Sequence, residues 1–252
     1  QALDAEDDGD SCVAIGHQAL SAQTGVSGEV GNTAVGALAG DAVTTGIKNV
    51  FVGAGAGGAT TDVDETVVIG YGAGAVGYAA LDTIDADDQN TAFGYKTLTA
   101  QTGTSGEVGN TAVGYQAGQF ITTGTHSTFI GNQAGQGIGG TKLTGTHNTC
   151  VGSEAGLLLQ GAANNNTIVG ALAGDAITTG DGNTIMGKSA GSAAADVDDL
   201  VIIGRGAGTS ALTSDADGAV FIGADAGSSN TAGQYNLAVG YSALAVNVTG
   251  DG

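Results

Sequence analysis

The sequence predicts an all-β fold, a parallel β-solenoid of the β-roll type. Three observations predict it: a short motif that recurs along the chain, a glycine at a fixed place in each copy, and a shortage of large apolar side chains. The chain has 252 residues, of which 48 are glycine and none is proline or tryptophan. A collagen-like triple helix is excluded because it needs proline and a glycine at every third position.

The recurring motif is Asn-Thr, two apolar residues, Gly, two variable residues and Ala-Gly, as in residues 32–40. Its middle glycine, called the anchor glycine below, recurs at spacings of 17 to 24 residues, most often 17. We therefore expect about 13 to 14 coils built on a unit of about 17 residues. The anchors are Gly16, Gly36, Gly53, Gly70, Gly94, Gly114, Gly131, Gly152, Gly170, Gly187, Gly204, Gly223 and Gly240.

The three residues before each anchor predict a short strand, for example residues 33–35 and 167–169. Position −3, counted from the anchor, is mostly Thr or Val, and position −1 is always Ile, Val, Phe or Met. Such residues favour an extended chain. Alternation puts positions −3 and −1 on one face and position −2 on the other. We expect −3 and −1 to face the coil interior and −2 to face outward.

Three further positions have their own expected roles. The anchor glycine ends the strand at a corner where a side chain would obstruct the backbone. The alanine at +3 points inward where there is room for a methyl group only. The asparagine at −4, present in eight units (residues 32, 49, 90, 110, 148, 166, 183 and 236), predicts a hydrogen-bonded ladder from coil to coil.

The repeat runs through residues 1–252, which predicts a single repeat array. Loops inserted between coils are expected at about residues 58–65, 76–89, 136–147, 193–199 and 210–218. Both ends of the sequence fall within a coil, so we expect a slice of a longer fibre.

Position −2 is never charged, so both faces of each strand are apolar and both are expected to be buried. One face would fill the coil, and the other would pack on sister chains in an intertwined or side-by-side trimer. The alternative is that turns or insertions of the same chain cover the second face.

The segment Asn-Thr-Ala-Val-Gly-Tyr-Gln-Ala-Gly at 110–118 resembles repeats of bacteriophage tail fibres. The segment Ser-Cys-Val-Ala-Ile-Gly at 11–16 is similar to the head repeats of trimeric autotransporter adhesins. The resemblance implies a left-handed parallel β-roll with three chains side by side. The 17-residue unit is longer than the adhesin unit and carries longer insertions.

The charge excludes several classes of partner. Five Lys and Arg residues stand against 25 Asp and Glu residues, giving a net charge of −20. Nucleic-acid binding is not expected because phosphate contacts need basic side chains. Membrane insertion is not expected either, and the chain is assigned to an extracellular or virion-surface location.

Two sets of side chains are candidate binding residues. Acidic clusters in the insertions are candidate Ca²⁺ ligands, because Ca²⁺ binds carboxylate oxygens; solvated acidic loops are the alternative. The calcium candidates are Asp62, Asp64, Asp196, Asp198, Asp215 and Asp217. Tyrosines at position +1 are candidate glycan contacts on one ridge: Tyr71, Tyr95, Tyr115 and Tyr241.

No constellation of catalytic residues emerges, so no enzyme and no cofactor are expected. His126 and His147 occupy similar Gly-Thr-His contexts and, with His17, are expected on surface turns. Cys12 belongs to the first unit and Cys150 to the eighth, too far apart for a disulfide. Cys150 is expected to fill the interface between chains.

These observations predict a structural and adhesive fibre segment, a rigid rod whose surface attaches to a host or substrate. The alternative is a self-assembling filament or surface-layer subunit without a receptor. A regular threonine array for ice binding is not expected, because the Thr-Thr pairs at 44–45, 122–123 and 178–179 lie several coils apart.

Overall fold

The computed structural model describes residues 9–24, 28–58, 61, 67–69, 90–102, 108–210, 212 and 216–246. They belong to two compact units, Gln1–Thr123 and Gly124–Gly252, which are described one at a time. The described residues form a parallel β-solenoid of about 11 turns with a spacing of about 17 residues and no helix. The expected fold class is confirmed. The left-handed sense and the trimer stay predictions.

The first unit contains two groups of parallel strands with a three-residue ladder in each. β2 (Val13–Ile15) pairs with β4 (Thr33–Val35), then β5 (Val50–Val52) and β6 (Val67–Ile69) follow. β7 (Thr91–Phe93) pairs with β8 (Thr111–Val113). The two-residue strands β1 (Gly9–Asp10) and β3 (Gly28–Glu29) also pair in parallel. This last pair is not predicted by the repeat.

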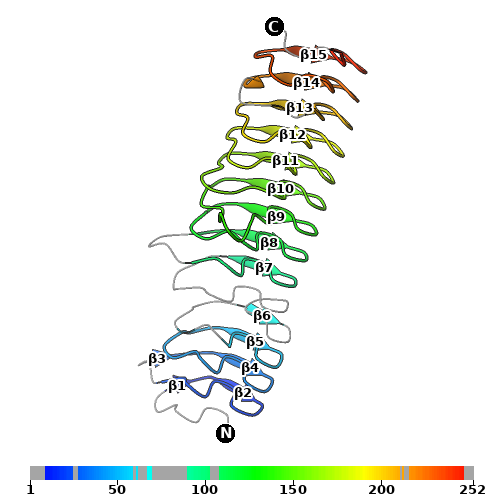
Figure 1. The fold of residues 1–252 in the computed structure, drawn as a ribbon. Coiled ribbons are helices and arrows are strands. Elements are labelled where there is room, and N and C mark those ends of the chain that lie inside the picture. Colours follow the sequence, from blue (N-terminus) through cyan, green and yellow to red (C-terminus); the bar gives the residue numbers. More distant parts are fainter. Residues whose placement is uncertain are drawn as a thin grey trace. The chain divides into compact units, whose positions relative to one another are not determined.

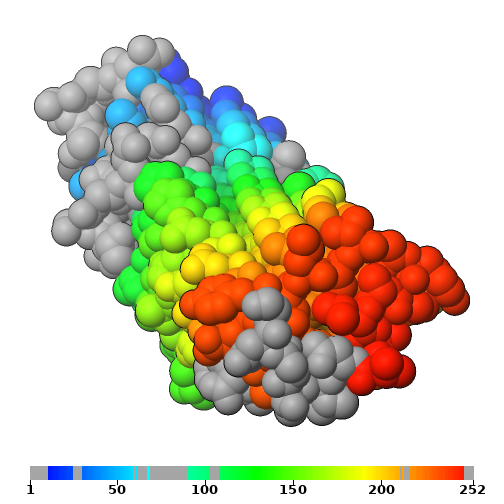
Figure 2. All heavy atoms as spheres, turned by 90° about the horizontal axis from the view of Figure 1, so that it is seen from above, coloured from blue at the N-terminus to red at the C-terminus, as the bar shows by residue number. Residues whose placement is uncertain are grey.

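The second unit is an unbroken ladder from β9 to β15, in which each strand pairs with the next (Figure 1). Like positions face each other: Cys150 is opposite Ile168, and Val151 is opposite Val169. Its coils lie directly against one another in the space-filling view, green through red (Figure 2). The strands are β9 (Thr128–Ile130), β10 (Thr149–Val151), β11 (Thr167–Val169), β12 (Thr184–Met186), β13 (Val201–Ile203), β14 (Val220–Ile222) and β15 (Leu237–Val239).

Every three-residue strand ends on the residue directly before an anchor glycine, as expected from the repeat. The expected faces, however, are wrong. Position −2 fills the coil, since Phe51, Phe129, Cys150, Ile168 and Phe221 are fully buried. Positions −3 and −1 face outward.

In the units that carry it, the asparagine at −4 explains this orientation. It lies two residues before position −2, so both side chains point to the same face, and Asn32, Asn148 and Asn166 are fully buried. An amide with four hydrogen-bonding sites is stable inside the coil only where the backbone offers partners, and the coil's turns supply them. Position −2 is therefore carried inward with the amide.

Two more inward positions complete the core. The alanine at +3 is buried as expected, for example Ala155 and Ala173. Thr97, which replaces this alanine in one unit, is also buried, and its hydroxyl donates to the Gly94 carbonyl at 3.3 Å. Position +7, to which the repeat assigned no expected role, is buried as well, for example Leu159 and Ile177.

The anchor glycine is needed for two reasons, as Gly152 shows. Its φ of +136° is rarely adopted by residues with a side chain, and a Cβ there would lie 2.6 Å from the carbonyl carbon and oxygen of Gly170. Stacked coils approach so closely at this corner that only glycine fits. Gly70, the anchor after β6, lies outside the described residues.

The expected insertions are described in part. Within 136–147, Leu143 is buried and forms a parallel bridge with Gly161, so this insertion continues the stack. Within 193–199, Ala194 and Val197 are buried in the coil. Most of 58–65 and 76–89, and part of 210–218, lie outside the described residues.

Candidate interaction surface

One continuous surface of the second unit is the outward face of its strands, called the outward strand face below. It consists of positions −3 and −1 of seven paired strands and carries no charged side chain. At about 4.8 Å per strand, it extends about 29 Å along the ladder. Its residues are Thr128, Ile130, Thr149, Val151, Thr167, Val169, Thr184, Met186, Val201, Ile203, Val220, Ile222, Leu237 and Val239.

None of these side chains is buried. The exposed fraction is 41% for Met186 and rises to 64% for Val239 on the last strand. The first unit has the same feature, because Ile15 is 59% exposed and Phe93 is 56% exposed. Exposed or half-buried apolar side chains at matching places on successive coils form a stripe, and a contiguous stripe of this kind marks an interaction site or an aggregation hazard.

Behind this face, inside the coils, a ladder of asparagine side chains joins neighbouring coils by hydrogen bonds. The Asn166 amide donates to Oδ1 of Asn148 at 3.0 Å, and Asn183 donates to Oδ1 of Asn166 at 2.9 Å. Each amide also donates to a backbone carbonyl across the coil, that of Gly180 for Asn166 at 2.7 Å. The expected ladder is confirmed here, and it fixes the register of neighbouring strands.

Where position +7 is a glutamine, the ladder has a different partner. Asn32 donates to Oε1 of Gln23 at 2.6 Å, and Asn110 donates to Oε1 of Gln101 at 2.8 Å. Both glutamines are fully buried. The sequence contains this signal as a glutamine nine residues before the asparagine in both copies.

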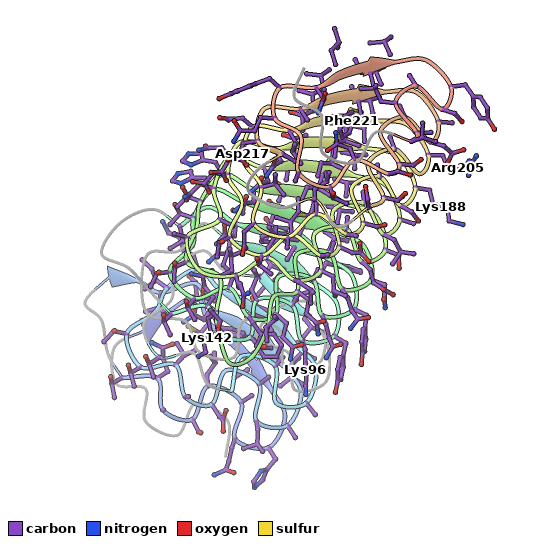
Figure 3. The ribbon with its side chains drawn as sticks, turned by 45° about the horizontal axis from the view of Figure 1, so that its top comes forward. Lys96, Lys142, Lys188, Arg205, Asp217 and Phe221 are labelled. Atoms are coloured by element: carbon purple, nitrogen blue, oxygen red, sulfur yellow. The ribbon has the colours of Figure 1, made fainter. Side chains whose placement is uncertain are left out.

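Charges gather on the turns that flank the strands rather than on the outward strand face. Figure 3 shows Lys188 and Arg205 together at one edge and Asp217 at the other, with Phe221 inside the coil. Arg205 forms an ion pair with Asp225 at 3.3 Å. This pair is exposed, so its contribution to stability is about 0–1 kcal/mol.

The calcium candidates that the structure describes bind the chain's own groups. Oδ1 of Asp198 accepts the backbone N–H of Asp181 at 2.7 Å, and Oδ1 of Asp217 accepts that of Asp198 at 2.9 Å. Hydrogen bonds from Thr178 and Thr179 lower the pKa of Asp196.

These carboxylates therefore form a ladder along the turns. Within the ranges that the structure describes, no group of three or more His, Cys, Asp or Glu side chains is placed to hold a metal ion. Asp62, Asp64 and Asp215 lie outside those ranges.

Two of the four candidate tyrosines stand together as expected. The rings of Tyr95 and Tyr115 stack with centroids 5.1 Å apart and an interplanar angle of 6°, and the Lys96 ammonium lies 5.4 Å from the Tyr95 centroid. Tyr241 belongs to the second unit and is 78% exposed. Tyr71 lies outside the described residues.

The cysteines and histidines are placed as follows. Cys150 is fully buried within its own coil, not at an interface between chains, so this expectation is wrong, and burial raises the pKa of its thiol. All three histidines are exposed, as expected for surface turns. The rings of His126 and His147 stack on adjacent coils, with centroids 5.2 Å apart.

The described part of the chain contains no helix long and apolar enough to cross a membrane. Comparison of the chain with protein-family models, with curated proteins and with solved structures found no match.

Proposed function

We propose that this chain is a structural and adhesive segment of an extracellular or virion-surface fibre, which associates with sister chains and offers a surface for attachment to a host or substrate. The observation that carries the proposal is the outward strand face. Seven consecutive strands present apolar and threonine side chains to the outside, while the net charge of −20 is placed elsewhere.

Association of sister chains follows from the chemistry of this face. Burying exposed aliphatic side chains contributes about 25 cal/mol per Å² of apolar surface. The face presents threonine or aliphatic side chains at each coil, so a second copy presents a surface of the same spacing. Because the face is uncharged, contact through it brings no charged side chain of these strands into the interface.

Light scattering coupled to size exclusion tests this association. We expect the unaltered chain to form a defined oligomer, a trimer in the simplest case. Met186→Glu, which puts a charge on the outward strand face, should dissociate it. Ala162→Glu adds the same charge at an exposed position outside the strands and should leave the oligomer intact.

The other outcomes are equally informative. A monomer at all concentrations, or equal effects of the two substitutions, would contradict the proposal. Growth into polymers without a limit would favour the second candidate, a filament or surface-layer subunit without a receptor. Loss of glycan or cell binding in Tyr115→Ala would support the adhesive role of the tyrosine ridge.

A further inference from the structure

His126 and His147 occupy the same place on two adjacent coils of the second unit. Each lies five residues before its anchor, in a turn with positive φ (54° and 59°). The pairing of β9 with β10 fixes the two turns side by side, and the His147 backbone N–H donates to the Thr125 carbonyl at 3.0 Å. The imidazole rings are stacked at 5.2 Å with an interplanar angle of 6°.

The same ring nitrogen is held in both residues. Nδ1 of His126 lies 2.9 Å from the Thr125 hydroxyl, and Nδ1 of His147 lies 2.9 Å from the Thr146 hydroxyl. The Thr146 hydroxyl in turn donates to Oδ1 of Asn164 at 3.4 Å. The tautomer of His147 that donates its Nδ1 proton to this hydroxyl leaves the lone pair on Nε2.

This arrangement prepares the two rings as ligands. A metal-binding histidine characteristically donates its other ring N–H to a carboxylate, a backbone carbonyl or water, which fixes its tautomer and orientation. Here the hydroxyl of the preceding threonine takes that place in both coils. Both side chains are exposed, so a metal ion reaches both Nε2 atoms from solvent.

We propose that His126 and His147 form a two-histidine site for a borderline divalent transition metal, Cu²⁺ foremost and Ni²⁺ or Zn²⁺ more weakly. Imidazole suits these ions, and Cu²⁺ stands highest in the affinity order. Metal–nitrogen bonds of about 2.0–2.1 Å limit the separation of the two nitrogens to about 4 Å. Each Nε2 lone pair lies in its ring plane, so the two parallel rings have to rotate toward each other to bind one ion, and water would fill the remaining positions.

The surroundings favour a cation at this place. Along the same turns, the next coils carry Asn164 and then Asp181, whose carboxylate accepts the Asn164 N–H at 2.6 Å. With a net charge of −20, the whole chain attracts cations. The selectivity for Cu²⁺ over Ca²⁺ comes from the two nitrogen ligands, since hard cations prefer oxygen.

Calorimetric titration of the full chain with Cu²⁺, in a non-coordinating buffer with excess Ca²⁺ to occupy the carboxylates, tests the site. We expect one tight Cu²⁺ per chain, weakened at least about tenfold in His126→Asn and in His147→Asn, because each loses a ligand held beside the first. Asparagine suits these turns, since Asn165 adopts a φ of 57° at the same place in the next coil. The control is His17→Asn, an exposed histidine of the first unit, which should leave the affinity unchanged.

Electron paramagnetic resonance of the Cu²⁺ complex gives a second readout that does not depend on a variant. Hyperfine coupling to two imidazole nitrogens is expected in the unaltered chain and coupling to one in either single variant. A single nitrogen in the unaltered chain, or an equal loss of affinity in His17→Asn, would overturn the proposal.

Discussion

Asn166 shows how one residue holds two coils together. Its amide donates to Asn148 and to the Gly180 carbonyl, and its Oδ1 accepts from the backbone N–H of Asn183 at 3.1 Å and from the Asn183 amide at 2.9 Å. All three asparagines are fully buried, so water cannot replace a missing partner. The recurrence of asparagine at −4 therefore reflects the need to satisfy buried backbone groups in the coils that carry it.

Replacing Asn166 by alanine should lower the free energy of unfolding by about 3 kcal/mol, because several buried donors and acceptors lose their partner at about 1–3 kcal/mol each. Chemical denaturation followed by circular dichroism measures this. The matched control is Asn165→Gly, next in sequence but exposed and in a turn of positive φ, which should change stability by a few tenths of a kcal/mol. Equal effects of both substitutions would contradict the ladder.

At the scale of the strand, the two faces have opposite environments. In β9 the middle residue, Phe129, is fully buried, whereas Ile130 is 39% exposed. A Cβ on Gly135 would lie 2.0 Å from the Phe129 ring, so the glycine at +4 makes room for the large side chain at −2. The core is one side chain wide at this position, and glycine and alanine on the facing turn adjust its width.

The opposite environments of Phe129 and Ile130 predict unequal losses of stability when each is replaced by alanine. Phe129→Ala should lower the free energy of unfolding by about 3–5 kcal/mol, as for other buried aromatic residues. Ile130→Ala should cost less than about 1 kcal/mol. Both are measured by guanidinium denaturation at protein concentrations where light scattering detects single chains, so that contacts between copies do not contribute. A larger loss of unfolding free energy in Ile130→Ala than in Phe129→Ala would mean that Ile130, and not Phe129, faces the coil interior.

At the scale of the whole molecule, stability is a sum of contacts between neighbouring coils, as in other solenoids. A chain with 25 acidic and 5 basic residues also repels itself, because carboxylates on successive turns lie near one another. The ladder of Asp181, Asp198 and Asp217 is a local case, in which hydrogen bonds from backbone N–H groups offset the repulsion.

Salt should therefore stabilise this protein. Raising NaCl from about 0.01 M to about 0.15 M shortens the Debye length from about 30 Å to about 8 Å, so the melting temperature followed by circular dichroism should rise. Lys188→Glu, which makes the net charge more negative at an exposed edge, should steepen this dependence. A melting temperature that falls with salt would show that attractive ion pairs outweigh repulsion.

Most of the architecture could be predicted from the repeat. The strand before each anchor, the close approach at the anchor glycine, the inward alanine at +3 and the asparagine ladder all follow from residue types at fixed positions. The predicted faces were wrong because alternation separates two faces without saying which is inside. The signal that resolves it was present: a polar amide recurring at −4 shares its face with −2.

The positions of the strands and of the turns follow from residue types alone. The turns are set by the anchors, because only glycine permits the close backbone approach there. Tertiary structure decided which side chains meet. It closed the coil around the asparagine ladder, which decided which face is buried, and it left the outward strand face uncovered. It also brought the ring centroids of His126 and His147 to 5.2 Å, although the two residues are 21 positions apart in the sequence. The physical reason is that these contacts depend on the register of stacked coils, which hydrogen bonding between coils sets.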